Sequence, residues 1–357
     1  MTAKKKNIVV MTIDGQEIHS RKGSTVLKTA LTHGIDIPHL CYHPRLHPLA
    51  SCRLCVVEVE GSRALVSACS RMVEEGMVVT TRSKRVITAR RMVLELLLSD
   101  HPYDCLTCER SGNCELQDYA YEHQVENQRF AGKKHEHVID DANPFIVRDF
   151  NKCIRCYRCA QACLEAQYCN VIDYQGRGFD TLVTSAGNRV LPKTDCVYCG
   201  RCVSVCPVGA LTEKGSRYQG RSKNLKWTHT TCPYCGVGCN IILETDGRRI
   251  VRVISNDKAP INKGNLCVKG RFGFGFVDHP DRLTKPLIKK KGKFVEASWN
   301  EALTLATAKL KETKKKYKAD SIAFLASSKC TNEENYALQK FARAGVGTNN
   351  VDNCARL

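Results

Sequence analysis

Short runs of apolar residues that alternate with polar ones occupy much of residues 7–81. Such alternation is typical of strands that bury one face. The first run is residues 8–13, and Asp14-Gly15 follows it as a two-residue turn signal. Residues 24–33 instead have apolar positions at helical spacing. The pattern predicts a small sheet built around one helix.

A longer helix is predicted over residues 83–98, with arginines on the side opposite its apolar positions. These apolar positions are Val86, Ile87, Met92, Val93, Leu96 and Leu97. The helix would lead directly to His101. Its apolar run at 92–98 is interrupted by Glu95 and is far shorter than the roughly 20 residues that span a membrane. No membrane span is predicted.

Three later segments have simpler patterns. Residues 127–146 are polar and charged, which predicts a linker, and residues 176–192 are expected to form a small hairpin. Two strand-like runs, 240–244 and 249–255, flank Asp246-Gly247. This turn signal predicts a second hairpin.

The last sixty residues alternate between helical and strand patterns. Ser298-x-x-Glu301 and Thr331-x-x-Glu334 are capping-box signatures, each of which predicts the start of a helix. The apolar run at 322–326 predicts a strand between these helices, and the second helix is expected to end at Gly345. Together they predict the beginning of an α/β layer.

The chain contains 22 cysteines, which is an unusually high content. Its 357 residues are enough for two to four compact units. The N-terminus has no apolar signal segment and no twin arginine, so we expect a cytoplasmic protein with reduced cysteines rather than disulfides. The formal charge is +19, but the lysines are scattered and thiolate-bound clusters would add negative charge. No nucleic-acid binding is predicted.

One cysteine pattern occurs twice between residues 153 and 206. Each copy has the C-x2-C-x2-C-x3-C spacing of two-cluster bacterial ferredoxins, in which the fourth cysteine binds the other cluster. Pro207 completes the second copy, whereas Leu164 replaces the usual proline of the first. Zinc usually takes two separated pairs of ligands, which fits these triplets poorly. The predicted [4Fe-4S] ligand sets are Cys153, Cys156, Cys159 and Cys206, and Cys196, Cys199, Cys202 and Cys163. Cys169 matches no ligand position.

Three further groups have cluster spacings. Cys41, Cys52, Cys55 and Cys69 form C-x10-C-x2-C-x13-C, a plant-type [2Fe-2S] pattern with a longer first gap and a shorter last gap. Cys232, Cys235, Cys239 and Cys267 form C-x2-C-x3-C-x27-C, which predicts a [4Fe-4S] cluster. Structural zinc is the alternative for both groups. The third group, called the His101 group below, is His101, Cys105, Cys108 and Cys114. Three thiols leave one iron unfilled, and an imidazole can fill it.

The N-terminal groups resemble known modules. The first, within PHLCYHPRLHPLASCRLCVVEVEG, resembles the N-terminal domain shared by the large iron–sulfur subunit of respiratory complex I, iron-only hydrogenases and some formate dehydrogenases. The resemblance implies a β-grasp fold, with His39, His43 and His47 as loop residues. The His101 group resembles the histidine-ligated [4Fe-4S] module that follows in the same families.

The C-terminal motifs CPYCGVGC, LCVKGRFGF, HPDRLTKPLI and SWNEAL resemble the opening domain of molybdopterin oxidoreductases. The resemblance implies a molybdenum or tungsten bis-molybdopterin guanine dinucleotide cofactor beside the cluster. Lys269 matches the lysine that this family places between cluster and pterin. A relay protein would have no evident use for Lys269 or for HPDRLTKPLI.

The final segment, SSKCTNEENYALQKFARAGVGTNNVDNCARL, is similar to formate dehydrogenase α subunits. In that family the next residue is the selenocysteine or cysteine that binds the metal, with a catalytic histidine beside it. No residue up to Leu357 fills either role, and neither Cys330 nor Cys354 is assigned to a metal. A UGA codon taken as a stop would explain the ending.

These patterns predict an α+β multidomain chain. The expected domains are a β-grasp [2Fe-2S] domain (1–82), a [4Fe-4S] domain with one histidine and three cysteine ligands (83–142), a 2[4Fe-4S] ferredoxin-type domain (143–222), a molybdopterin oxidoreductase [4Fe-4S] domain (223–290) and the incomplete start of the α/β domain (291–357). The resemblance implies reversible oxidation of formate to CO2 by the full-length protein. We expect this chain alone to be inactive toward formate. The resemblance also implies a flavin-containing NAD(P)H-linked subunit, ferredoxin or a hydrogenase subunit as electron partner. A non-catalytic electron-transfer subunit is the alternative.

Overall fold

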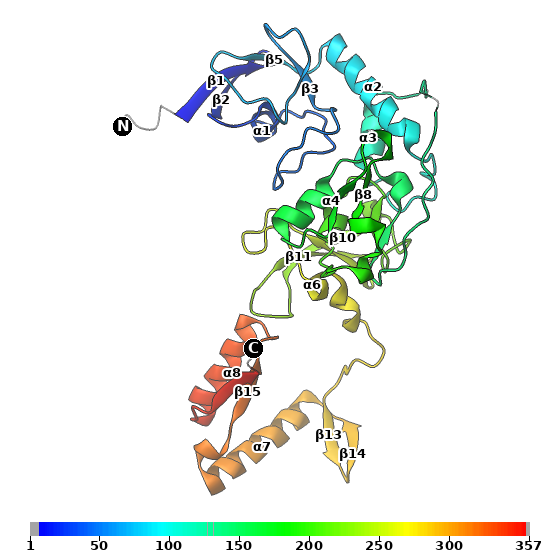
Figure 1. The fold of residues 1–357 in the computed structure, drawn as a ribbon. Helices are drawn as coiled ribbons and strands as arrows, with labels where there is room; N and C mark the ends of the chain where they lie inside the picture. The colour runs from blue at the N-terminus through cyan, green and yellow to red at the C-terminus, as the bar shows by residue number, and fades with distance from the viewer. Residues whose placement is uncertain (1–6, 127, 131, 355–357) are drawn as a thin grey trace. The chain divides into compact units, whose positions relative to one another are not determined.

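The computed structural model describes residues 7–126, 128–130 and 132–354 (Figure 1). The chain forms two compact units, residues 1–225 and 226–357. The five domains expected from the sequence divide the chain more finely than this, and their boundaries stay predictions.

Unit 1 begins with the predicted sheet around one helix. The hairpin of β1 (Ile8–Ile13) and β2 (Gln16–Arg21) turns at Asp14 and Gly15, whose φ angles of 49° and 82° lie in the left-handed region. The sheet order is β2-β1-β5-β3-β4, with β1 parallel to β5. This is the β-grasp topology. The other elements are α1 (Val26–Thr32), β3 (Val56–Val59), β4 (Val66–Ser67) and β5 (Val78–Thr80).

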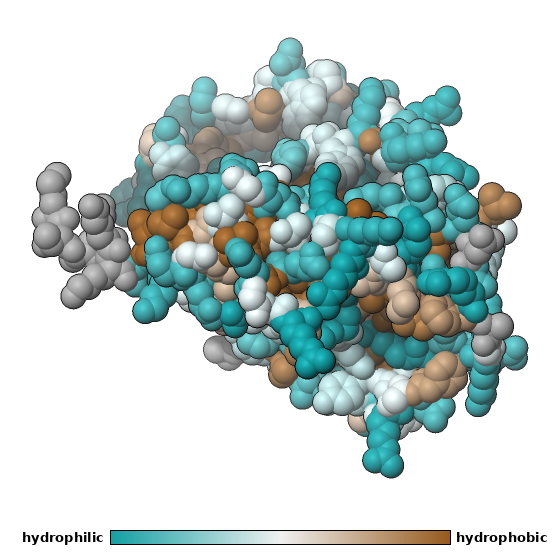
Figure 2. Space-filling model, turned by 90° about the horizontal axis from the view of Figure 1, so that it is seen from above, coloured by the Kyte–Doolittle hydropathy of each residue, from teal (hydrophilic) through white to brown (hydrophobic). Residues whose placement is uncertain are grey.

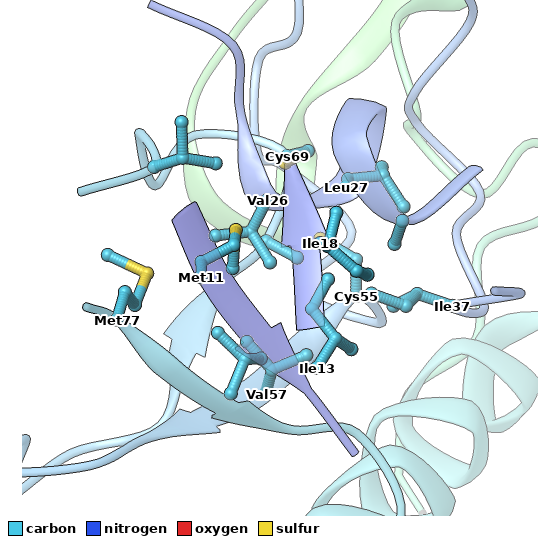
Figure 3. Close-up of a cluster of buried hydrophobic side chains, with 14 of the residues drawn as sticks. Met11, Ile13, Ile18, Val26, Leu27, Ile37, Cys55, Val57, Cys69 and Met77 are labelled. Carbon is cyan, nitrogen blue, oxygen red and sulfur yellow. The ribbon is translucent and has the colours of Figure 1, made fainter. Parts of the chain in front are cut away.

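The core of this domain lies between the sheet and α1 (Figure 3). Alternate residues of β1, Met11 and Ile13, point into it beside Ile18 of β2 and the first residues of α1. Cys55 and Cys69 belong to the same buried cluster. Two predicted metal ligands are therefore part of the domain core.

The predicted long helix is α2 (Lys84–Asp100), which begins where the Ser83 side chain accepts a hydrogen bond from the Val86 N–H. Its predicted apolar face is wrong in part. Ile87, Met92 and Leu96 are exposed, whereas Arg90 and Glu95 are buried. Tertiary contacts explain why these two charged residues are buried. Arg90 donates a hydrogen bond to the Val56 carbonyl at 2.9 Å, and Glu95 pairs with Arg129 at 2.6 Å.

The rest of unit 1 is built from short elements. The helices are α3 (Glu115–Glu122), α4 (Arg158–Gln161) and α5 (Arg201–Val205). The strands form two antiparallel pairs, β6 (Ile146–Arg148) with β9 (Leu211–Glu213) and β7 (Ile172–Gln175) with β8 (Leu182–Ser185). The predicted small hairpin is thus present, but its first strand starts before residue 176. The described part of the predicted linker packs against α2 through Arg129 and His135.

Unit 2 opens with an antiparallel sheet of β10 (Lys226–Thr231), β11 (Asn240–Thr245) and β12 (Ile250–Ser255). The β11–β12 hairpin confirms the prediction from Asp246-Gly247. The chain continues through α6 (Val268–Phe272) and the hairpin of β13 (Leu287–Lys290) and β14 (Lys293–Glu296). Neither β10 nor this last hairpin was predicted.

The predicted α/β alternation follows. It consists of α7 (Trp299–Tyr317), β15 (Phe324–Ser327), α8 (Asn332–Lys340) and β16 (Val351–Cys354), and β15 pairs with β16 in parallel. Both capping boxes are present. The predicted stop at Gly345 is wrong, because a π-helical turn (Phe341–Val346) extends α8 and the left-handed residue is Gly347, with φ of 85°.

The face seen in Figure 2 is mainly hydrophilic, with hydrophobic residues in separate patches between charged ones. Within the described residues, no helix has both the length and the apolar character needed to cross a bilayer.

Candidate iron–sulfur sites

The [2Fe-2S] candidates lie together inside the β-grasp domain. Cys41, Cys52, Cys55 and Cys69 are all buried. The Cys41 thiol contacts those of Cys52 and Cys69, and Cys55 contacts Cys69. Hydrogen bonds from the Cys52 and Cys69 thiols hold the pKa of Cys41 far below its usual value. Four thiols that share so little space fit a compact two-iron centre.

The sheet positions two of these thiols. Cys55 precedes β3 and Cys69 follows β4, and the antiparallel register Val56↔Ser67 brings the two cysteines together. The Ala68 N–H donates to the Cys55 carbonyl at 3.0 Å, which continues the ladder to the site. His39, expected to be a loop residue, contacts the Ile37 carbonyl through Nδ1 at 2.7 Å.

The unusually long gap between Cys41 and Cys52 makes contacts of its own. Leu46 is buried against Ala162 and Val205 beside the ferredoxin cysteines. The His47 N–H donates to Glu165 at 2.9 Å, and the Ser51 hydroxyl donates to the Cys156 carbonyl at 3.5 Å. The extra residues therefore dock the [2Fe-2S] loop on the ferredoxin domain.

The three cysteines of the His101 group form a series of neighbours, and His101 lies at the end of α2. His101 caps the C-terminus of that helix, and Cys114 immediately precedes α3. Burial raises the pKa values of the Cys108 and Cys114 thiols, and each has another cysteine of the group among its charged neighbours. Cys105 is exposed.

His101 has the environment of a metal ligand. The side chain is buried, and its Nδ1 has no hydrogen-bond partner among the described residues. Burial lowers the pKa of His101 to about 4, so the ring is neutral at pH 7 and keeps a lone pair. An unpaired buried ring nitrogen is costly, and coordination to iron would satisfy it.

The two ferredoxin-type sites are cavities lined by thiols. One is lined by Cys153, Cys156, Cys159 and Cys206, and the other by Cys196, Cys199, Cys202 and Cys163. Each cavity thus combines three cysteines of one motif with the fourth cysteine of the other motif. Cys169 also lines the second cavity. Sequence spacing gave no signal for this fifth thiol, because its place depends on the folding of residues 167–171.

Burial shapes the chemistry of these thiols. It raises the pKa of Cys153 to about 11 and that of Cys156 further. Buried thiolates need a positive partner, which iron supplies by binding sulfur directly. The thiols of each ferredoxin-type site line a cavity, and a multi-iron cluster would fill it.

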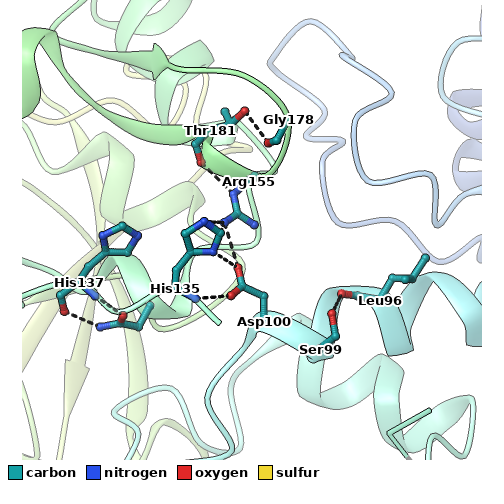
Figure 4. Close-up of polar contacts among 9 residues, drawn as sticks. Leu96, Ser99, Asp100, His135, His137, Arg155, Gly178 and Thr181 are labelled. Carbon is teal, nitrogen blue, oxygen red and sulfur yellow. Dashed lines mark hydrogen bonds and ion pairs between the residues drawn. The ribbon is translucent and has the colours of Figure 1, made fainter. Parts of the chain in front are cut away.

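A polar network joins the His101 group to the first ferredoxin cavity (Figure 4). Asp100, next to His101, contacts His135 Nδ1 at 2.7 Å and accepts a hydrogen bond from Arg155 at 2.9 Å. Arg155 precedes Cys156 and also donates to the Thr181 carbonyl. The His135 ring stacks on Phe179 with centroids 3.9 Å apart. These contacts fix two ligand loops against each other.

A second connection between the same two sites is an ion pair. Arg158 is buried and donates two hydrogen bonds to Glu115, at 2.7 and 2.9 Å. Glu115 directly follows Cys114, and its N–H donates to the Pro207 carbonyl at 3.0 Å. Burial opposes the charge of Arg158, but Glu115 and the thiols of Cys156 and Cys206 outweigh it, so the pKa of Arg158 is raised.

The last cysteine group lies in unit 2. The Cys232 N–H donates to the Cys239 carbonyl at 2.8 Å, and the thiol of Cys239 has Cys232, Cys235 and Cys267 as charged neighbours. A Cβ on Gly270 would lie 3.5 Å from the Cys232 sulfur and 3.9 Å from the Cys267 sulfur. The β11–β12 hairpin brings Cys267 back to the other three cysteines, as the sequence predicted.

Three other residues singled out in the sequence lie near these elements. Lys269 is exposed on α6, two residues after Cys267. Cys330 is half-buried, and its N–H donates to the Ser327 carbonyl. The side chain of Cys354 and the residues beyond it lie outside the described structure.

Five family models match the chain in series. They are a 2Fe-2S iron-sulfur cluster binding domain (residues 6–84), the NADH-ubiquinone oxidoreductase-G iron-sulfur binding region (90–129), the ferredoxin-like domain of NADH-quinone oxidoreductase subunit 3 (143–212), the molybdopterin oxidoreductase Fe4S4 domain (225–279) and molybdopterin oxidoreductase (282–357). Their order confirms the predicted fold class.

Similar proteins carry different names. The chain is 37% identical over 350 residues to the NADPH-Fe(3+) oxidoreductase subunit alpha of Geobacter sulfurreducens, and 38% identical over 351 residues to an NADH-quinone oxidoreductase subunit of Rhizobium meliloti. It is 32% identical over 387 residues to putative formate dehydrogenases of Staphylococcus aureus. These matches cover 98% of this chain but only 39–40% of each relative.

A solved structure is also similar. A chain of an NAD+-reducing [NiFe]-hydrogenase matches with a TM-score of 0.57 and 34% identity, over 60% of this chain and 91% of that one. The family models, the sequence relatives and this solved structure all agree with the iron–sulfur domains predicted from the cysteine groups and with the fold. Residues 225–357 are therefore similar to the start of molybdopterin oxidoreductases, residues 6–212 are similar to iron–sulfur domains like those of NADH-quinone oxidoreductase, and the chain spans about two fifths of the length of the relatives named above.

Proposed function

We propose that this chain is the electron-transfer part of a formate dehydrogenase α subunit, with one [2Fe-2S] and four [4Fe-4S] clusters held by the residues described above. The observation that carries the proposal is the pair of thiol-lined cavities, each completed by the fourth cysteine of the opposite motif. Formate as substrate is supported by the final segment and by relatives named putative formate dehydrogenases.

The proposed reaction is the interconversion of formate with CO2, a proton and two electrons. A bis-pterin molybdenum or tungsten centre supplies two-electron chemistry when bound, and iron–sulfur clusters then carry single electrons. Within this chain, Lys269 is our candidate for binding between the pterin and the cluster of Cys232, Cys235, Cys239 and Cys267. The metal-binding selenocysteine or cysteine and the catalytic histidine are expected beyond Leu357.

The proposed route branches at the ferredoxin domain. The His101 group reaches that domain through the Glu115–Arg158 pair, and the [2Fe-2S] loop reaches it through Leu46 and Ser51. Either site could be the outlet to a flavin-containing NAD(P)H-linked subunit, a ferredoxin or a hydrogenase subunit. We propose such a partner because of the hydrogenase and quinone-oxidoreductase relatives.

An electron-transfer subunit without catalysis is the second candidate, favoured by the 91% coverage of the hydrogenase chain. The test uses the whole natural protein, purified without oxygen. If the first proposal is right, formate reduces the clusters, and Lys269→Ala slows this reduction without changing the iron content. If NAD(P)H reduces the clusters and formate does not, the relay is the function.

The nucleotide sequence beyond Leu357 gives an independent test. The proposal predicts a UGA codon, an in-frame continuation and a selenocysteine-insertion hairpin, or a cysteine codon in a corrected reading frame. Absence of any continuation would favour the relay.

A further inference from the structure

The second ferredoxin cavity holds one more thiol than a four-iron cluster needs. Cys163, Cys196, Cys199 and Cys202 line it as predicted, and Cys169 lines it as well. Among the described residues, the first cavity is lined by its four predicted cysteines and no other thiol. The two sites come from the same repeated motif, so the fifth thiol is a specific difference between them.

Cys169 lies on a tight loop that wraps around Cys163. Its N–H donates to the Cys163 carbonyl at 3.0 Å, and the Val171 N–H donates to the Cys163 sulfur at 3.2 Å. The residues on either side, Tyr168 and Asn170, both have left-handed backbones, with φ of 56° and 47°. The loop therefore holds Cys169 beside Cys163 through local backbone contacts.

The missing proline of the first motif explains how the chain can make this loop. Leu164 stands where the second motif has Pro207, and the residues around Leu164 form a π-helical turn, Ala162–Ala166. A proline would remove a backbone N–H and restrict the preceding residue, both of which oppose helical continuation. With leucine the chain continues one turn past Cys163 and then returns over the cavity.

The side chain of Cys169 is held in place at this position, because its sulfur donates to the Gln167 carbonyl at 3.4 Å. Cys163 is the ligand closest to it along the chain, whereas Cys196, Cys199 and Cys202 come from the other motif. An exchange between Cys163 and Cys169 would require movement of one short loop only.

We propose that Cys169 is a reserve ligand of the second ferredoxin cluster and replaces Cys163 when that thiolate is lost. The inference rests on the iron–sulfur function proposed above. In the exchange, the iron–sulfur bond to Cys163 breaks and one to Cys169 forms. The proton of the Cys169 thiol passes to the released Cys163 thiolate, so no electron is transferred and the charge of the cluster does not change.

The test compares Cys163→Ala with Cys206→Ala in the full chain, reconstituted without oxygen. Both substitutions remove the fourth ligand of a ferredoxin-type cluster, but of the two described cavities only that of Cys163 has a fifth thiol. Electron paramagnetic resonance distinguishes four-iron from three-iron clusters, and iodoacetamide labelling with mass spectrometry reports whether Cys169 is bound. The [2Fe-2S] signal of the β-grasp domain reports folding in the same samples.

We expect Cys163→Ala to keep a four-iron cluster at the second site. Cys169 should be protected from labelling in this variant but should be labelled in the wild type. Cys206→Ala should convert the first site to a three-iron cluster, and the double variant Cys163→Ala/Cys169→Ala should do the same at the second. Cys163→Ser, which nearly keeps the size of the side chain, provides the same comparison if the alanine variant folds poorly.

A three-iron cluster in Cys163→Ala or Cys163→Ser, with Cys169 still labelled, would overturn the proposal. Failure of the iron–sulfur function itself would look different, because the wild-type protein would then hold no four-iron cluster at either ferredoxin site.

Discussion

Replacing Arg158 with glutamine should lower the reduction potential of the first ferredoxin cluster. Arg158 is only 5% exposed, and the thiols of Cys156 and Cys206 are among the charged groups that act on it. Reduction adds one negative charge to a cluster, so a buried positive charge nearby stabilises the reduced form. Removing that charge makes the cluster harder to reduce.

The size of the effect follows from Coulomb's law. For two unit charges taken to be about 7 Å apart, at an effective dielectric constant of about 20, Coulomb's law gives about 2.4 kcal/mol, or about 100 mV for a one-electron couple. Glu115 opposes this contribution with two hydrogen bonds to Arg158, but its side chain is 40% exposed and better screened by water. Glu115→Gln should therefore raise the potential, by about half as much.

The assay is a redox titration followed by electron paramagnetic resonance on wild type, Arg158→Gln, Glu115→Gln and the double variant. The double variant should lie between the two single variants, because it loses both charges. Arg85→Gln is the matched control: it removes the same charge from an exposed position on α2 that pairs with Glu58. The reasoning is refuted if Arg158→Gln and Glu115→Gln shift the potential in the same direction, or no further than the control does.

Three other outcomes can be measured directly. The anaerobically reconstituted chain should contain about 18 iron and 18 sulfide, from one two-iron and four four-iron centres, and finding only zinc would contradict the whole assignment. His101→Ala should leave a three-iron cluster at its site while His101→Cys keeps four irons, as paramagnetic resonance would show. Leu94→Ala should lower the free energy of unfolding by about 3 kcal/mol in denaturant titrations, because Leu94 is fully buried, whereas the exposed Leu96→Ala should change it by less than about 0.5 kcal/mol.

Elements with a local signal could be predicted from the sequence. The turn at Asp14-Gly15, the start of α2 after Ser83 and the capping box at Thr331 each depend on residues that are neighbours in the chain. The buried face of α2 could not be predicted in the same way. It is set by the contacts of Arg90 and Glu95 with residues more than thirty positions away.

The features of the sites also differ in whether a local sequence pattern could predict them. Cysteine spacing predicted which thiols would share a cavity, because each spacing is a property of one loop and the crossing of fourth ligands is a property of the repeated motif. The thiol of Cys169 and the Glu115–Arg158 pair gave no such signal, because both depend on how separate loops pack.

The structure gives a physical reason for the long gap between Cys41 and Cys52, which departs from plant-type spacing. A shorter gap between Cys41 and Cys52 would still close a loop around two irons, but it would lack Leu46, His47 and Ser51 as contacts to the ferredoxin domain. Electron transfer between clusters requires that their sites stay close, and a β-grasp domain joined only by a flexible chain would not guarantee this. We infer that the ten intervening residues serve the neighbouring cluster site as much as the [2Fe-2S] site. Shortening the loop should therefore slow transfer between the two centres while leaving the [2Fe-2S] signal unchanged.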